Sequence, residues 1–397
     1  MSSVSEKKLT FSFNVSLSSI VLVGIIVQIF STQGILMYNL FKVLGNWELK
    51  KYLHPIGVMI VLIPSIYSFF SKKRIVFSAE TILLFGYLTL HYLILIFFKN
   101  ISVDSFLYSF REVAFIFTLI ASYRLFYFPK KYLNVISKTL IILSILNIIF
   151  VLLTMYIGPE AYMKLLTGRY FWPTDPLLKF KISTFVGGFY RSPGLIGESA
   201  SVGFFGVFSF FLILHSQYKR YFWIPLILVL LSFTRSAYLV LIIYGLLLIL
   251  KKKKYLRIAI RISPLIIGAL FYAIYINLFD IRSLWMRIDN WINKIDLNSN
   301  VLFGGNLNRI GSTAADGSGF ESVFDNYWLF LYHGIGLFGI FLVLIFLSKK
   351  KFFTNSTFYI SISLFISGLF ITYTQSIPFL VFFPLLTISN WWYEEKN

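Results

Sequence analysis

Residues Tyr190 to Gly203 read Tyr-Arg-Ser-Pro-Gly-Leu-Ile-Gly-Glu-Ser-Ala-Ser-Val-Gly, where a long polar segment meets a long apolar run. The stretch contains an arginine, a carboxylate, and the serines and glycines that are typical of a helix start. An ionisable residue is costly in lipid, so one at the edge of an apolar run indicates function by default. We interpret the rest of the chain around this segment and a second polar segment, Asp280 to Asp325.

The composition predicts an all-α, polytopic integral membrane protein. Of 397 residues, 58% are hydrophobic and only 13% are charged, with a mean hydropathy of +0.79. A soluble domain cannot bury so much apolar surface. No linker or internal repeat divides the chain, so we expect a single transmembrane domain over residues 1–397. Met1 to Lys8 is polar and basic without a cleavage site after it, which predicts a retained first helix rather than a signal peptide.

Several classes of function are excluded or disfavoured. The net charge of +20 comes from short basic runs between apolar spans, which is the positive-inside pattern rather than a nucleic-acid surface. With no cysteine, the chain has no disulfide, thiolate nucleophile or iron–sulfur site. A phosphate-binding G-x-x-x-x-G-K-[ST] loop and an H-E-x-x-H motif are both missing, and the four histidines are scattered. We therefore expect no cofactor and no metal.

A helix needs about 20 apolar residues to cross a membrane, and this length predicts about twelve spans. They are Phe11–Phe30, His54–Phe70, Ile75–Phe98, Phe106–Phe126, Ile136–Ile157, Leu195–His215, Tyr221–Phe233, Ser236–Leu250, Leu256–Leu278, Asn326–Leu347, Ser356–Ile371 and Pro378–Trp392. Residues 31–53 are mixed, which indicates an interfacial amphipathic segment. Long loops remain at about residues 158–194 and 279–325.

The basic clusters set the orientation. They are Lys7-Lys8, Lys72-Lys73-Arg74, Lys130-Lys131, Lys219-Arg220, Lys251 to Lys254 and Lys349 to Lys351, and all fall on one side of the predicted spans. That side is the cytoplasm. Both termini are then cytoplasmic, and both long loops lie outside.

The two short spans between Tyr221 and Leu250 have basic clusters at both outer ends. We expect two short helices forming a hairpin, with Thr234-Arg235-Ser236 at a turn sunk in the outer leaflet. A single tilted helix with an arginine at mid-membrane is the alternative, and it would reverse the orientation of everything downstream.

Six charged side chains fall on one predicted level, the outer headgroup region. They are Arg111, Glu112, Arg191, Glu198, Arg235 and Asp325. On this interpretation Glu198 lies about one turn inside the sixth span. The structural explanation is a set of ion pairs, such as Arg111 with Glu198, and snorkelling. The functional explanation is a site for phosphate oxygens, which guanidinium groups bind while staying charged.

The glycines and the second loop leave alternatives open. Gly194, Gly197 and Ser199 allow a sharp turn whose free N–H groups favour an anion, although an ordinary helix cap is the commoner meaning. Ile281 to Ile295, with Arg287, has the spacing of an interfacial helix. The glycine-rich stretch that follows, with Arg309, is either a mobile lid or a plain connector.

Three segments resemble the O-antigen polymerase and O-antigen ligase superfamily of bacterial surface-polysaccharide enzymes. They are Arg191 to Ser199, Ser232 to Ala237, and Trp285 through Phe324-Asp325-Asn326-Tyr327 to Gly339. Ligases of this superfamily have a His-Asn pair where this chain has Asp325-Asn326, and Pro-Asn near Glu198-Ser199. Both departures point to the polymerase branch.

The resemblance implies a GT-C-like, inverting, metal-independent glycosyltransferase of the bacterial inner (cytoplasmic) membrane, with its site facing the periplasm. The growing glycan on undecaprenyl diphosphate would pass to the sugar hydroxyl of a lipid-linked repeat unit. Catalytic roles would fall to Arg191, Glu198 and Asp325. Substrate-binding roles would fall to Arg235, Arg287, Arg309, Arg111, Glu112 and Tyr190.

The resemblance also implies partners and competing functions. The partners would be undecaprenyl-diphosphate-linked oligosaccharides, with a chain-length regulator and a flippase in the same membrane. An O-antigen ligase would differ in its acceptor. A lipid-linked oligosaccharide flippase or another transporter would need charges at the midplane and broken helices, and a structural scaffold would not need the arginines.

Overall fold

Every regular element that the structure describes is a helix. The computed structural model describes residues 3–46, 49–71, 78–99, 110–126, 130–167, 191–251, 268, 285, 288–289, 291–293, 301–304, 326–347, 362–363, 368 and 377–386. Within these ranges the backbone forms helices and turns without a strand, which confirms the all-α class.

The N-terminal helices form an adjoining pair and a bend. Helix α1 (Ser3–Ser31) packs along α3 (Lys50–Ser71), where the buried Gln28 amide donates to the Gly57 carbonyl at 3.3 Å. Helix α2 (Gly34–Val43) then leaves the second half of α1 at an angle of 97°. This bend agrees with the prediction that residues 31–53 do not continue the first span.

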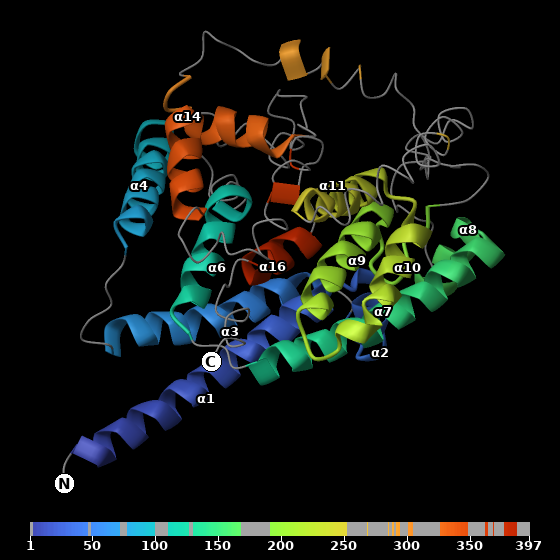
Figure 1. The fold of residues 1–397 in the computed structure, drawn as a ribbon, viewed down its shortest axis with the longest axis horizontal. Helices are drawn as coiled ribbons and strands as arrows, with labels where there is room; N and C mark the ends of the chain where they lie inside the picture. Colours follow the sequence, from blue (N-terminus) through green and yellow to red (C-terminus); the bar gives the residue numbers. More distant parts are fainter. Residues whose placement is uncertain are drawn as a thin grey trace.

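Helix α9 (Ser199–Leu214) lies at the centre of one half of the molecule (Figure 1). It contacts α7 (Lys130–Ile157), α10 (Trp223–Ser232), α11 (Arg235–Lys251) and α16 (Ile377–Leu386). Residues 201–213 of α9 are all buried, as expected for a helix that is apolar on every face.

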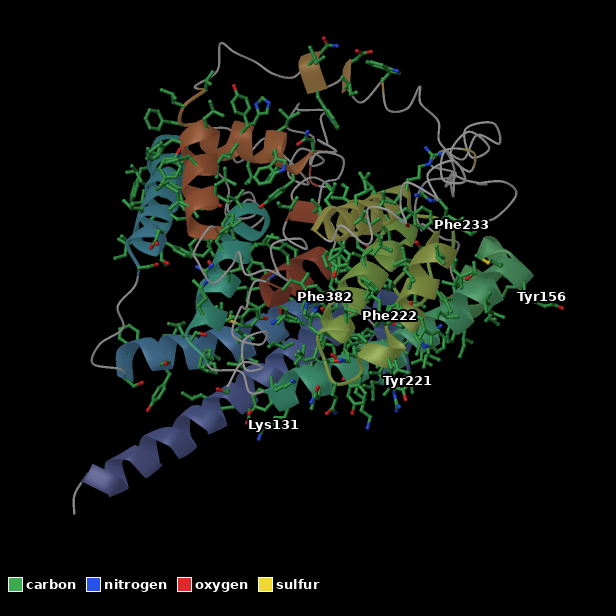
Figure 2. All side chains as sticks on the ribbon, viewed as in Figure 1. Lys131, Tyr156, Tyr221, Phe222, Phe233 and Phe382 are labelled. Carbon is green, nitrogen blue, oxygen red and sulfur yellow. The ribbon has the colours of Figure 1, made fainter. Side chains whose placement is uncertain are left out.

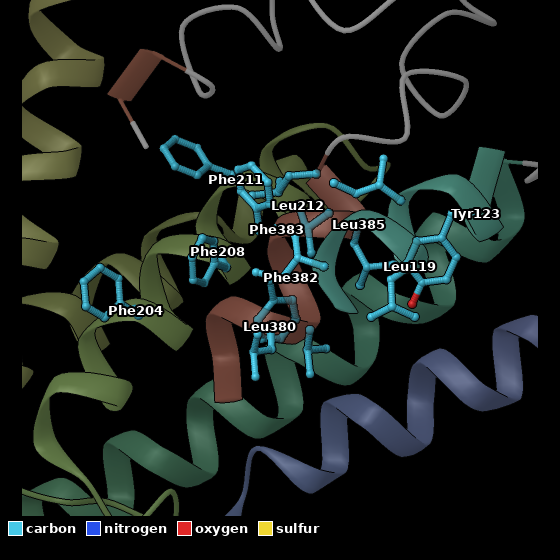
Figure 3. Packing of buried hydrophobic residues seen from close by; sticks show 14 of the residues in the cluster. Leu119, Tyr123, Phe204, Phe208, Phe211, Leu212, Leu380, Phe382, Phe383 and Leu385 are labelled. Carbon is cyan, nitrogen blue, oxygen red and sulfur yellow. The ribbon is translucent and has the colours of Figure 1, made fainter. Parts of the chain in front are cut away.

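Phenylalanine rings hold this centre together (Figure 3). Phe205 and Phe208 lie on one face of α9, and each ring centroid is 5.7 Å from that of Phe382 in α16. On another face, Phe211 meets Tyr244 of α11 at 4.9 Å. Offset and edge-on ring pairs of this kind stabilise a core beyond the area that they bury.

The other half contains α4 (Ala79–Lys99) packed on α14 (Tyr327–Leu347), beside the π-helical turn η2 (Phe110–Ala114) and α6 (Phe115–Arg124). Helix α14 breaks at Gly336 (φ 67°, ψ −178°). At the break, the Leu337 and Phe338 amides donate to the Val301 and Leu302 carbonyls at 3.1 and 3.0 Å. Part of the predicted second outer loop therefore lies against the middle of a predicted span.

The smaller elements are α8 (Pro159–Thr167) after α7 and the 3-10 turn η3 (Lys219–Tyr221) before α10. Figure 2 shows Phe233 at the end of α10 opposite to Tyr221 and Phe222. Phe233 is left-handed (φ 48°, ψ 31°), and α11 begins two residues later. The chain thus forms two short helices here, as predicted, rather than one tilted helix.

Two helices of the described chain, α7 and α14, are long and apolar enough to cross a membrane. The α1–α2 pair adds a third if its bent halves form one span. These helices support a membrane protein, whereas about twelve spans, a GT-C-like arrangement and a single domain remain predictions. The count falls short partly because α9, α10 and α11 have only 16, 10 and 17 residues. The spans predicted at 256–278 and 356–371 lie largely outside the described residues.

At one place in the structure, helix ends that the sequence assigns to the cytoplasmic side lie together. Near the end of α6, Arg124 donates to the Phe346 carbonyl near the end of α14 at 3.3 Å, and its guanidinium lies 4.4 Å from the Phe346 ring. Glu80, at the start of α4, is within electrostatic range of Arg124. All three positions adjoin predicted cytoplasmic clusters, so this contact agrees with the predicted orientation.

A substitution at Gly203 tests how closely α9 packs on the turn before α11. A Cβ at this position would lie 2.6 Å from the Thr234 Cβ and 2.9 Å from the Ser232 Oγ. We expect Gly203→Ala to cost about 1–3 kcal/mol because the core is overpacked. The readout is the thermal unfolding midpoint of the purified protein. Gly245→Ala on α11, where nothing lies within 4 Å of a Cβ, should leave the midpoint unchanged or raise it, and equal losses in both variants would contradict the close contact.

Candidate functional site

The segment Arg191 to Glu198 is a buried, non-helical stretch that leads into α9. Ser192 to Ile196 are buried, while Arg191 is half-buried and Glu198 is exposed. Gly194 (φ 49°) and Gly197 (φ 99°) both have positive φ, as the predicted sharp turn requires. A Cβ at Gly194 would lie 2.8 Å from the Asn147 Oδ1, so this position also requires a glycine for space.

The peptide groups around Gly194 and Leu195 bind residues from three other helices. The Leu195 amide donates to Asn147 Oδ1 of α7 at 3.0 Å, and its carbonyl accepts from the Ile35 amide of α2 at 2.8 Å. The Gly194 carbonyl accepts from the Tyr162 hydroxyl of α8 at 2.8 Å. A buried peptide group without a partner is costly, so these contacts let irregular backbone lie among packed helices.

The α2 contact also caps that helix. Ile35 and Leu36, in the first turn of α2, both direct their amides to the Leu195 carbonyl, at 2.8 and 3.4 Å. Helix starts leave such amides without partners inside the helix, and Gln33 at the N-cap makes no side-chain cap bond. The Leu195 carbonyl, distant in sequence, accepts from these amides instead. This contact attaches the bend between α1 and α2 to the segment before α9.

Arg191 connects this segment to the turn between α10 and α11. Its Nε donates to the Phe233 carbonyl at 3.0 Å. Thr234 follows, and Arg235 is the first residue of α11 and half-buried. The Tyr238 hydroxyl donates to the Leu230 carbonyl at 2.6 Å, holding the first turn of α11 against α10. The structure therefore brings together the two arginine segments that the sequence grouped only by predicted depth.

Glu198 corrects one expectation. We predicted it about one turn inside the sixth span, but it is the exposed N-cap of α9, with extended backbone (φ −144°, ψ 127°). The apolar residues Leu195 and Ile196 resemble the start of a helix in the sequence, yet the positive φ of Gly197 delays the helix to Ser199. The Glu198 carboxylate accepts a hydrogen bond from the Ser201 hydroxyl. It lies beside the positive end of the α9 dipole.

The remaining predicted site residues fall into two groups. Arg111 and Glu112 belong to the π-helical turn η2, a rare geometry that occurs often at functional sites. Tyr190, Arg287, Arg309 and Asp325 lie outside the described residues. Asn326, next in the chain, is the buried N-cap of α14 and accepts from the Trp328 and Leu329 amides at 3.0 and 3.1 Å.

Three residues around the segment were not among the predicted site residues. Asn147 and Gln33 are fully buried, and the Asn147 Nδ2 donates to the Gln33 Oε1 at 2.7 Å. Tyr162 is also fully buried, and burial raises the pKa of its hydroxyl, which therefore stays protonated as a donor. An asparagine inside the apolar run Ile136–Ile157 was a visible signal, whereas nothing in the sequence marked Tyr162.

In the part of the chain that the structure describes, no three His, Cys, Asp or Glu side chains gather closely enough to hold a metal ion. The expectation of a metal-independent site remains a prediction. Among the described residues, the candidate site consists of Arg191 bound to the Phe233 carbonyl, Arg235 at the start of α11, and Glu198 at the start of α9.

The comparisons with known proteins give no relative. No family model matches the chain, and neither a curated protein nor a solved structure matches it.

Exposure and sidedness of the site are testable because the chain has no cysteine of its own. We expect Glu198→Cys to react in right-side-out spheroplasts with a membrane-impermeant maleimide, since Glu198 is exposed at the predicted outer side. Ser209→Cys, fully buried on the same helix, is the matched control and should stay unlabelled until denaturation. Labelling of Glu198→Cys only after the membrane is opened would place the site on the cytoplasmic side.

Proposed function

We propose that the chain is a membrane glycosyltransferase that polymerises lipid-linked oligosaccharide repeat units. In this reaction the growing glycan leaves undecaprenyl diphosphate for the sugar hydroxyl of an incoming lipid-linked unit. The observation that carries the proposal is the contact between Arg191 and the Phe233 carbonyl, which places two arginine segments side by side. The resemblance of these same segments to surface-polysaccharide polymerases supplies the reaction.

The electrostatics of the site favour a diphosphate. A cation at the start of a helix is unfavourable by about 0.3–1 kcal/mol because it faces the positive end of the helix dipole. Arg235 occupies such a position in α11, and Gly203, in the first turns of α9, touches Thr234 just before it. Two helix starts and two guanidinium groups thus outweigh the single carboxylate of Glu198 and leave an excess of positive charge. A bound dianion would offset this charge, and arginine donors fork onto phosphate oxygens.

The short helix α10 gives the site a depth that suits a lipid-linked ligand. Its 10 residues rise about 15 Å, half of a hydrocarbon core of about 30 Å. If Lys219 and Arg220 lie at the cytoplasmic surface, as the basic clusters predict, the Phe233 turn is near the middle or in the outer half of the bilayer. A diphosphate there would sit close to its own lipid tail.

The proposed chemistry is a single displacement. The acceptor hydroxyl attacks the anomeric carbon of the donor, and the bond from that carbon to the diphosphate oxygen breaks with inversion. The electron pair goes to the diphosphate, whose growing charge Arg191 and Arg235 would stabilise. Glu198, whose side chain is exposed at the start of α9, would accept the hydroxyl proton, and Asp325 remains the other proposed base.

A ligase and a flippase remain alternative proposals, and one observation favours the second. The 97° bend between α1 and α2, the break in α14 at Gly336, and the irregular segment before α9 are interruptions of apolar helices. Discontinuous helices are typical of transporters. The arginine pair does not separate the two roles, because a flippase would also bind the diphosphate of its lipid-linked cargo. The resemblance of the arginine segments to polymerases is what favours the enzyme.

Removing either arginine should stop elongation. In a strain without the chain, expression of Arg191→Ala or Arg235→Ala should give single repeat units and no ladder on a glycan gel. Loss of such a donor costs about 10²–10³ in turnover. Arg220→Ala, at the opposite end of α10 and stacked on Tyr221, is the matched control and should restore full ladders.

The same gel separates the alternatives. Full ladders from both arginine variants would contradict the proposed site. Loss of all glycan attachment, single units included, would indicate a ligase. Lipid-linked units that accumulate on the cytoplasmic leaflet would indicate a flippase.

A further inference from the structure

A set of buried polar side chains surrounds the link between Gly194 and Leu195. Asn147 of α7, Gln33 between α1 and α2, and Tyr162 of α8 each have a relative exposure of 0%. We call these three residues the polar cradle. Polar side chains so deeply buried in an apolar bundle are costly unless they are hydrogen-bonded, so their contacts indicate what they hold.

Asn147 uses both ends of its amide. The Oδ1 accepts from the Leu195 amide at 3.0 Å, and the Nδ2 donates to the Gln33 Oε1 at 2.7 Å and to the Leu143 carbonyl at 2.9 Å. Gln33 continues the chain of bonds, because its Nε2 donates to the Thr32 Oγ1 at 2.9 Å. The bend of α1 and the irregular segment are thus connected through one asparagine.

Tyr162 and α2 complete the cradle from the other sides. The Tyr162 hydroxyl donates to the Gly194 carbonyl at 2.8 Å, and the Ile35 amide donates to the Leu195 carbonyl at 2.8 Å. The Gly194 amide donates to the Ser192 Oγ at 3.2 Å. Each N–H and C=O of these two residues therefore has a partner, which selects one conformation of the link.

The two ends of the held segment are residues of the proposed site. Arg191 lies three residues before Gly194 and binds the Phe233 carbonyl, and Glu198 lies three residues after Leu195 as the N-cap of α9. A shift of the link would move both residues relative to Arg235. We propose that Asn147, Gln33 and Tyr162 are positioning residues that set the place of Arg191 and Glu198, and this inference rests on the proposed function.

The expected effect on turnover follows from geometry. Misplacement of a reacting group by about 1 Å can cost roughly 100-fold in rate. Asn147→Leu removes the acceptor for Leu195 and the donor for Gln33 at similar volume, and Tyr162→Phe removes a single donor. We expect losses of roughly 10- to 100-fold in polymerisation per folded molecule, larger for Asn147→Leu.

The test measures the position of the segment independently of activity. Because the chain contains no cysteine, spin labels can be placed at Glu198→Cys and Leu246→Cys in full-length protein in lipid nanodiscs. Leu246 is exposed on α11, so the label pair reports the distance between the segment and the helix that carries Arg235. We expect Asn147→Leu and Tyr162→Phe to shift or broaden this distance distribution.

Two variants serve as matched controls. Ser144→Ala lies on the same helix as Asn147 and is fully buried, and its hydroxyl has no hydrogen-bond partner among the described residues. Tyr156→Phe removes a hydroxyl from an exposed tyrosine of α7, the helix that carries Asn147 (Figure 2). Neither should change the distance distribution, the turnover or the unfolding midpoint.

The outcomes separate the inference from the proposed function. Unchanged distances in Tyr162→Phe and in every folded Asn147 variant would overturn the positioning role. Altered distances in the cradle variants alone, together with lost elongation, support it. A third outcome is that the cradle variants alter the distances while these variants and Arg191→Ala all make full ladders. In that case the cradle still holds the segment, and the proposed polymerase function is overturned.

Discussion

The fold of the site depends on the requirement that buried peptide groups be hydrogen-bonded. Residues 192–197 leave helical geometry among packed helices, where water cannot solvate the backbone. Their polar groups instead bind α2, α7 and α8, through Ile35, Asn147 and Tyr162. Because these partners come from three different helices, the segment can hold its shape only when the surrounding bundle is assembled. Arg191 and Glu198 flank the segment, so the hydrogen bonds that fix the segment also restrict the positions of these two residues.

The same principle explains why irregular backbone recurs in this chain. At Gly336 of α14, the amides after the break are satisfied by carbonyls of residues 301–302, and the Tyr87 hydroxyl donates to the Ile335 and Phe303 carbonyls at 2.6 and 3.1 Å. At Gly336, a piece of the predicted second outer loop forms hydrogen bonds in the middle of a helix. In the predicted first outer loop, the Gly194 carbonyl accepts from the buried Tyr162 hydroxyl. The loops are therefore part of the packed bundle as well as connections between spans.

Part of this structure could be predicted from the sequence. Two short helices were predicted here because each apolar run is short and each ends in a basic cluster, and the structure has α10 and α11. The approach of Arg191 to the turn before Arg235 was inferred from depth alone, and a hydrogen bond realises it. The sharp turn at Gly194 and Gly197 followed from glycine spacing. The two short helices and the sharp turn depend on residues close together in the sequence, so local patterns can predict them.

The rest required contacts between distant residues. Leu195 and Ile196 resemble helix residues by hydropathy, so Glu198 was placed inside a helix that begins only after it. The carbonyl of Leu195 caps α2, about 160 residues earlier in the chain, and no pattern near either residue could indicate such a pairing. Asn147 was a polar residue in an apolar run, but its partners Gln33 and Leu195 become apparent only once the helices are packed.

We propose that Arg191 and Arg235 bind one diphosphate together. It is tested most directly by a double-mutant cycle on the affinity of undecaprenyl diphosphate for the purified protein in nanodiscs. Two side chains that share one ligand group are energetically coupled, whereas independent sites are additive. The account predicts that Arg191→Ala and Arg235→Ala each remove most of the affinity, and that the double variant binds little more weakly than either. Losses that simply multiply, or a single variant with unchanged affinity, would contradict it.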